Sequence, residues 1–154
     1  MKNKLVVMSF DDGELQDIRL TELLRKYGLT ASFGFCSGYV GRCGLLKNQP
    51  GRTIWRKIPE EKLCEVYNGF EMCSHGVYHR DFKDLSFDEL YKEVDGDRKF
   101  IEKIFGIDCR GAIYPGGSCD IQTAENLKKI GIEYARTIQE TYNFEPPENP
   151  LIWN

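Results

Sequence analysis

The chain has 154 residues with 21 basic and 24 acidic side chains, which gives a formal net charge of -3. This length suits one domain, residues 1–154, with a substantial core, but it is short for a complete barrel. The near balance of charge gives no reason to expect a nucleic-acid partner. No stretch approaches the ~20 consecutive apolar residues that a membrane span needs.

The N-terminus and the cysteines bear on the cellular compartment. Residues 1–4 lead directly into the apolar segment 5–8, which is too short for the hydrophobic region of a secretory signal, and no small-residue cleavage site follows. As it stands, the chain is expected in the cytoplasm, although a secreted protein whose signal had been removed would look the same. None of the six cysteines forms a C-x-x-C pair, and we expect reduced thiols rather than disulfides.

In the first half of the chain, hydrophobic patterns predict strands at 5–10, 31–36 and 70–74, and helices at 17–27 and 59–67. The first of these strands is almost continuously apolar, which is typical of a strand covered on both faces. Segment 37–52 is rich in glycine and contains Pro50, so we interpret it as a long loop.

In the second half, Ser86 and Glu89 form the pattern of a capping box, which predicts the start of a long helix that ends near Phe105. A strand at 109–114, a helix at 120–130 and a strand at 132–138 follow. The tail beyond residue 138 carries three prolines and is expected to be irregular.

Three predicted helices end in the same way. Basic residues occupy the last turn, and Gly28, Gly106 or Gly131 follows, directly before the next strand. Basic side chains complement the C-terminal end of the helix dipole, and glycine is the preferred left-handed C-cap. Repeated helix–glycine–strand units favour βαβ crossovers, so the predicted fold class is α/β with a parallel sheet.

The residues best suited to chemistry follow predicted strands. Asp11 and Asp12 come directly after the first strand, His75 follows strand 70–74, and Gly116 and Gly117 follow strand 109–114. The carboxyl ends of parallel strands lie at one edge of a sheet or barrel, where active sites are built. We therefore expect these segments to meet.

This set of side chains suits a metal hydrolase. His75 and His79 are the only histidines in the chain, and imidazole is a common zinc ligand. One carboxylate from the Asp11–Asp12 pair would complete a three-ligand site, and the other would be free to act as a base. The alternative is that the histidine pair is structural or solvated. Cys73 lies near His75, and we interpret it as a buried neutral thiol rather than a ligand.

At these residues the chain resembles the polysaccharide deacetylase family, also called the NodB-homology domain or carbohydrate esterase family 4. The T-F-D-D-G motif of the family appears at residues 9–13, its H-[S/T]-x-x-H motif at 75–79, and its third motif, R-x-P-[FY] with a following glycine, at 113–117. The resemblance implies an irregular (β/α) barrel, which we expect to be incomplete at the C-terminus. It also implies metal-dependent removal of acetyl groups from sugars.

By this resemblance, Asp12, His75 and His79 would hold a divalent metal, most often Zn²⁺ in this family, with Co²⁺, Mn²⁺ or Ni²⁺ as alternatives. Asp11 would be the catalytic base, and the Gly116 amide would serve the oxyanion hole. The expected partner is an acetylated carbohydrate, without nucleic acid or a membrane span. The resemblance leaves the oligomeric state open.

The chain departs from the family pattern at two places. Ile113 stands where the third motif has the arginine that orients the base, and Arg110, Arg136 or Arg80 could replace that arginine. Arg136 is our preferred candidate, because it lies at the end of strand 132–138. The chain also has no histidine after His79, whereas the family uses a later histidine as the acid that protonates the leaving amine.

These departures keep three functions open. The first is a metal-dependent deacetylase of an N-acetylated sugar, oligosaccharide or polysaccharide. The second is a hydrolase of another non-peptide C–N bond, such as that of a cyclic amide. The third is a catalytically impaired carbohydrate-binding domain. Four aromatic residues are candidates for stacking on sugar rings, although each is also suited to ordinary packing: Tyr39, Trp55, Tyr78 and Tyr142.

Overall fold

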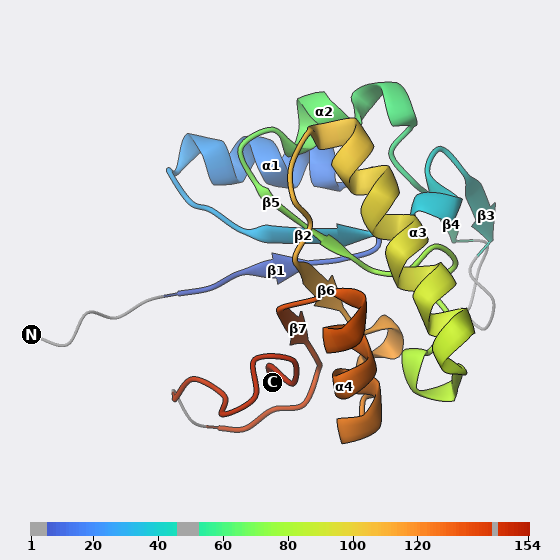
Figure 1. The fold of residues 1–154 in the computed structure, drawn as a ribbon. Coiled ribbons are helices and arrows are strands. Elements are labelled where there is room, and N and C mark those ends of the chain that lie inside the picture. Colours follow the sequence, from blue (N-terminus) through green and yellow to red (C-terminus); the bar gives the residue numbers. More distant parts are fainter. Residues whose placement is uncertain (1–5, 46–52, 143–144) are drawn as a thin grey trace, which may run out of the picture.

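The computed structural model describes residues 6–45, 53–142 and 145–154. Its centre is a five-stranded parallel sheet with the strand order β1-β2-β5-β6-β7, curled into an open half-barrel (Figure 1). The strands are β1 (Ser9–Phe10), β2 (Ser32–Phe35), β5 (Glu71–Ser74), β6 (Gly111–Ile113) and β7 (Tyr134–Arg136). The predicted α/β fold class is therefore confirmed.

Helices connect the strands and cover one face of the sheet. They are α1 (Asp17–Lys26), α2 (Glu60–Tyr67), α3 (Phe87–Phe105) and α4 (Ile121–Ile130), each close to its predicted bounds. The capping box of α3 forms as expected, and Gly106 and Gly131 are left-handed C-caps of α3 and α4. No helix among the described residues is long and apolar enough to cross a bilayer.

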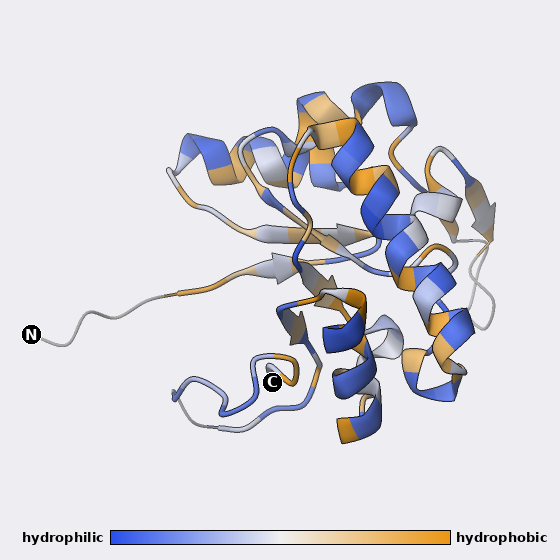
Figure 2. Ribbon diagram, in the orientation of Figure 1, coloured by the Kyte–Doolittle hydropathy of each residue, from blue (hydrophilic) through white to orange (hydrophobic). Residues whose placement is uncertain are grey.

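The core lies between the sheet and these helices. One cluster joins Phe33, Phe35 and Met72 of the sheet to Leu63 and Tyr67 of α2. A second cluster packs β6 and β7 against α3 and α4. Figure 2 shows the long helices banded in hydrophilic and hydrophobic colours, as expected for helices that bury one face. Burial of these apolar side chains fixes the strands, and with them the strand ends that carry the candidate site.

The prediction for the first strand was wrong in extent. Only Ser9 and Phe10 form β1, while Val6 and Val7 are 78% and 67% exposed. The reason is that β1 is the edge strand of the sheet and pairs with β2 alone. An apolar run predicts burial on both faces but does not identify the neighbours that supply it. Leu5 lies outside the described residues.

The prediction of one long loop at 37–52 was also wrong. Residues 37–39 form a 3₁₀ turn, η1 (Ser37–Tyr39), and β3 (Cys43–Leu45) pairs antiparallel with β4 (Ile54–Arg56). Gly44 lies opposite Trp55, and a Cβ at position 44 would approach the Trp55 ring to 2.6 Å. This glycine therefore makes room for the indole within a strand. Residues 46–52 lie outside the described part.

The tail forms no helix or extended strand where it is described, yet it is tied to the sheet. Trp153 makes a parallel bridge to Arg136, and the Thr137 amide donates to the Trp153 carbonyl (2.7 Å). The buried Tyr114 hydroxyl donates to the Leu151 carbonyl (2.9 Å). The apolar end of the chain thus covers the outer edge of β7.

The cysteines are free thiols, as the sequence predicts. Cys73 lies on β5, and burial raises its pKa well above the usual range. It is therefore a neutral core thiol at ordinary pH.

Asp17 is a buried carboxyl at the start of α1. Tyr67 donates a hydrogen bond to it (2.7 Å), but burial dominates and raises the Asp17 pKa from 3.8 to about 6. Because the folded pKa exceeds the unfolded value, the folded protein binds this proton more tightly. The resulting contribution to stability is complete below about pH 4 and is lost as the pH rises through 6.

We expect Asp17→Asn to gain stability relative to the wild type as the pH rises from 4 to 7.5, by about 2 kcal/mol after allowance for partial hydration. Urea unfolding at the two pH values measures this difference. The exposed Asp108→Asn is the control and should show no comparable change with pH. A difference between Asp17→Asn and wild type that is the same at both pH values would contradict the assignment.

Candidate metal and hydrolytic site

Three side chains from two strand ends meet at the C-terminal edge of the sheet. Asp12, His75 and His79 each offer one ligand atom within 4.8 Å of the others. His79 Nε2 lies 3.8 Å from Asp12 Oδ1, and the two imidazole rings are 4.7 Å apart, nearly perpendicular. The structure therefore brings together the three residues that the sequence suggested as metal ligands.

The backbone at this cluster adopts conformations that residues other than glycine rarely take. Asp12 has φ of 77° and His79 has φ of 55°. Such left-handed residues are uncommon, cost free energy, and concentrate at functional sites. Gly13 also has positive φ (62°), and a Cβ there would lie 2.7 Å from Phe35. The glycine of the first motif is thus required for the turn that presents Asp12.

The ring of His75 is held in one orientation. His75 is 1% exposed, and its Nδ1 lies 2.9 Å from the Ile113 carbonyl oxygen. Because a carbonyl can only accept, Nδ1 carries the proton and Nε2 has its lone pair free. Burial lowers the pKa of His75 and so favours the neutral ring. This arrangement, with one ring nitrogen anchored and the other free, is typical of metal-binding histidines.

Helix α3 supplies two buried carboxyl groups that hold the histidine loop. Asp97 accepts hydrogen bonds from the His75 amide (2.9 Å), the Ser74 hydroxyl (2.9 Å) and the Ser37 amide (2.8 Å). Glu93 accepts from the Tyr78 amide (2.8 Å). Burial raises the Asp97 pKa to about 7, although the hydrogen bonds oppose this rise. The sequence analysis did not identify either residue. Both could have been found as acidic side chains that lie on the apolar face of α3.

The second carboxylate of the pair has a different partner. Arg136 Nη2 lies 2.5 Å from Asp11 Oδ2, across 125 residues of chain. Arg110 instead pairs with Asp108 and Glu133, and Arg80 pairs with Glu89. Among the three arginines considered from sequence, Arg136 is therefore the one that contacts Asp11.

Gly116 lies in η3 (Pro115–Gly117), directly after β6, with φ of 66°. This turn is tied to the segment after His79, because the Ser118 hydroxyl donates to Asp81 (2.6 Å). The structure thus keeps the predicted glycine at the same edge of the sheet as the histidine loop.

Lys57 is a further residue of this site that sequence reasoning missed. Its ammonium lies 3.5 Å from Asp12 Oδ1 and 2.8 Å from Glu14, and its side chain is only 10% exposed. Lys57 directly follows β4, so the β3–β4 hairpin places it beside Asp12. No local pattern in the sequence marks it, since its partners are more than forty residues away.

Three of the four candidate stacking residues gather beside the histidines. Tyr39 lies 6.2 Å from Trp55 and 6.2 Å from Tyr78, measured between ring centroids. Lys57 lies 5.7 Å from the centre of the Trp55 ring. Tyr142 is 90% exposed and contacts Glu140 instead. The aromatic group therefore borders the Asp12 side of the site, and Tyr142 does not belong to it.

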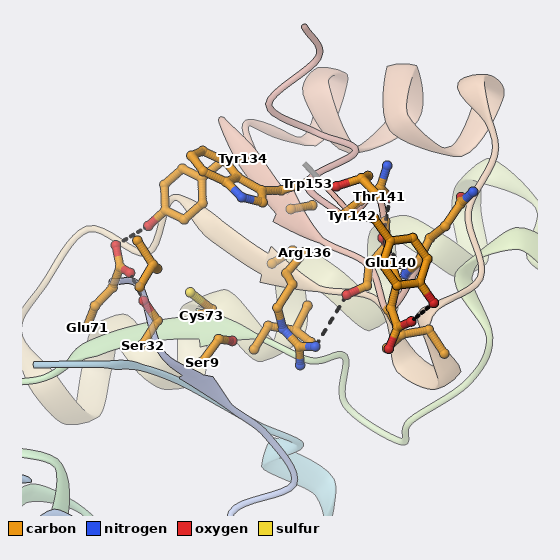
Figure 3. Close-up of a pocket in the computed structure, with 18 residues that line it drawn as sticks. Ser9, Ser32, Glu71, Cys73, Tyr134, Arg136, Glu140, Thr141, Tyr142 and Trp153 are labelled. Carbon is orange, nitrogen blue, oxygen red and sulfur yellow. Dashed lines mark hydrogen bonds between the residues drawn. The ribbon is translucent and has the colours of Figure 1, made fainter. Parts of the chain in front are cut away.

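A cavity of about 870 Å³ opens on the concave face of the sheet. Figure 3 shows Tyr134 and Glu71 on one side of it and Glu140 and Tyr142 on the other, with Arg136 between them. Asp12, His75 and His79 do not line this cavity, whereas Arg136, which pairs with Asp11, does. We therefore place the candidate chemistry at the strand ends rather than in this cavity.

The model of one protein family, described as polysaccharide deacetylase, matches residues 1–135. This chain belongs to the polysaccharide deacetylase family. The resemblance drawn from its motifs is thereby confirmed. None of the curated proteins matches the chain.

Several solved structures share this fold. A Streptococcus pyogenes deacetylase in complex with acetate is 19% identical, with a TM-score of 0.74 over 91% of this chain and 59% of its own. A Bacillus cereus polysaccharide deacetylase is 20% identical, with a TM-score of 0.75 over 98% of this chain and 46% of its own. This chain thus spans about half the length of these proteins.

A third solved structure is described as a pseudoenzyme of the same family, from Bacillus anthracis. It is 19% identical, with a TM-score of 0.64 over 88% of this chain and 44% of its own. Membership of the family and its fold therefore does not by itself establish catalysis.

We expect metal-free His75 to titrate below its ordinary pKa of 6.5 and to carry its proton on Nδ1 when neutral. The ¹⁵N chemical shifts of the ring nitrogens report both properties. The chain has only two histidines, so a His79→Gln variant assigns the signals. Finding the proton of the neutral His75 ring on Nε2 would contradict the anchored geometry.

Proposed function

We propose that this chain is the metal-dependent hydrolytic domain of a carbohydrate deacetylase. The observation that carries the proposal is the Asp12–His75–His79 cluster lying beside a separate Arg136–Asp11 ion pair. Two adjacent aspartates with different partners can take different roles. One faces the histidines and suits a cation, and the other is held by an arginine and suits proton transfer.

The donor set fits a divalent metal. One carboxylate and two neutral imidazoles match the three protein ligands of catalytic zinc sites, and Zn²⁺ is the ion that we propose. The anchored Nδ1 of His75 leaves Nε2 as its ligand atom. When bound, such an ion supplies Lewis-acid activation of water and of the acetyl carbonyl.

Within this proposal, Asp11 is the general base that accepts a proton from the attacking water. Arg136 orients the Asp11 carboxylate through their ion pair. The Gly116 amide is the proposed donor to the developing oxyanion, a role for which a fixed backbone N–H is well suited. The family supports an acetylated sugar as the substrate, and the Tyr39–Trp55–Tyr78 group offers ring faces for stacking.

We expect the Asp12→Ala, His79→Ala double variant to lose stoichiometric zinc uptake, because both proposed ligands are half-exposed and can be removed with little effect on the core. Equilibrium dialysis with metal analysis measures the uptake. The Asp108→Asn variant is the control. Uptake of one zinc ion per chain by the double variant would show that the metal binds elsewhere.

We expect Asp11→Asn to release acetate from acetylated chito-oligosaccharides about 10²–10⁴-fold more slowly than wild type, since it removes the general base. Arg136→Met should also slow the reaction, whereas Arg110→Met should not. All three variants should keep their zinc. Wild-type rates in Asp11→Asn would exclude it as the base.

Two other functions are alternatives to this proposal. Hydrolysis of another non-peptide C–N bond would use the same site, and screening cyclic ureides against acetylated sugars separates the two activities. A carbohydrate-binding domain without turnover has a precedent in the pseudoenzyme within the family. It predicts sugar binding without acetate release in the presence of zinc.

A further inference from the structure

Lys57 places a positive charge directly beside the proposed metal position. Its ammonium is 3.5 Å from Asp12 Oδ1, the same oxygen that lies 3.8 Å from His79 Nε2. A divalent cation held by Asp12 and His79 would therefore have the ammonium as a close neighbour. Two like charges at such a separation repel strongly in a partly buried site.

The surroundings of Lys57 hold it there. The side chain is 10% exposed, and its backbone forms a bridge with Glu14 and donates to the Arg42 carbonyl (2.9 Å). Its ammonium also contacts the Glu14 carboxylate (2.8 Å) and lies over the Trp55 ring. Glu14 thus offers the ammonium a second carboxylate that is closer than Asp12.

We propose that Lys57 is an internal cation that competes with the metal for Asp12, so that metal binding breaks the contact with Asp12 and leaves the ammonium paired with Glu14 alone. Lys57 is a positioning residue in this scheme: it neutralises Asp12 in the metal-free protein and lowers the affinity for the metal. The inference rests on the metal site of the proposed function, and it adds a residue that sets the strength of that site.

The direct test is the affinity for Zn²⁺ alone, measured by competition with a chromophoric chelator at pH 7.5. We expect Lys57→Met to bind Zn²⁺ at least tenfold more tightly than wild type, and Lys57→Arg, which keeps the charge, to stay near the wild-type affinity. Lys57→Gln provides a second neutral variant in case the methionine variant does not fold. Lys99→Met removes an exposed charge on α3 and should leave the affinity unchanged.

A double-mutant cycle tests the role of Glu14. Glu14→Gln removes the alternative partner of the ammonium and should weaken zinc binding severalfold in the wild-type background. In the Lys57→Met background the same change should have a much smaller effect, because there is no ammonium left for Glu14 to hold away from Asp12. Equal effects in the two backgrounds would contradict the proposed competition.

Trp55 gives a readout that does not depend on affinity. In a Trp153→Phe background, Trp55 is the only tryptophan, and its emission should change when Zn²⁺ shifts the ammonium relative to its ring. The response should be absent in Lys57→Met. A response that persists in that variant, or wild-type affinity in both neutral variants, overturns the inference while leaving the metal site intact. Absence of zinc uptake by the wild-type chain would instead overturn the proposed function.

Discussion

The parallel direction of the five strands is the constraint on which the candidate site depends. Because β1, β5, β6 and β7 all point the same way, their carboxyl ends deliver Asp11 and Asp12, the histidine loop, the Gly116 turn and Arg136 to one edge of the sheet. The apolar clusters between sheet and helices fix these ends in space. Reversing any one strand would remove its side chains from the site without changing their identity.

Charge compensation is the second organising feature. Two adjacent carboxylates repel one another when both are ionised. In the structure the two carboxylates have different partners. Asp11 forms an ion pair with Arg136, and Asp12 lies beside two imidazoles and Lys57. Beneath them, Asp97 and Glu93 of α3 bind the amides of the histidine loop from the buried side. The loop is therefore organised by groups that would not touch a substrate.

Family membership explains the fold and the motifs more firmly than the reaction. The departures at Ile113 and after His79 fall where the family resemblance places the groups that would orient the base and protonate the leaving group. Arg136 contacts Asp11 from the neighbouring strand, so the first departure has a structural counterpart. The Ile113 carbonyl also contributes to the site, because it accepts the hydrogen bond that orients the His75 ring.

The sequence by itself determined the alternation of strands and helices, the caps of α3 and α4, and the residues that form the cluster, because these follow from local periodicity and short motifs. It did not determine the short β1, the β3–β4 hairpin or the pairing of the tail with β7, since each depends on neighbours distant in the chain. Only the tertiary structure selected Arg136 over Arg110 and Arg80, and only it placed Lys57 and Asp97 at the site. The physical reason is that an ion pair is defined by distance in space, and Asp11 and Arg136 are 125 residues apart in the chain.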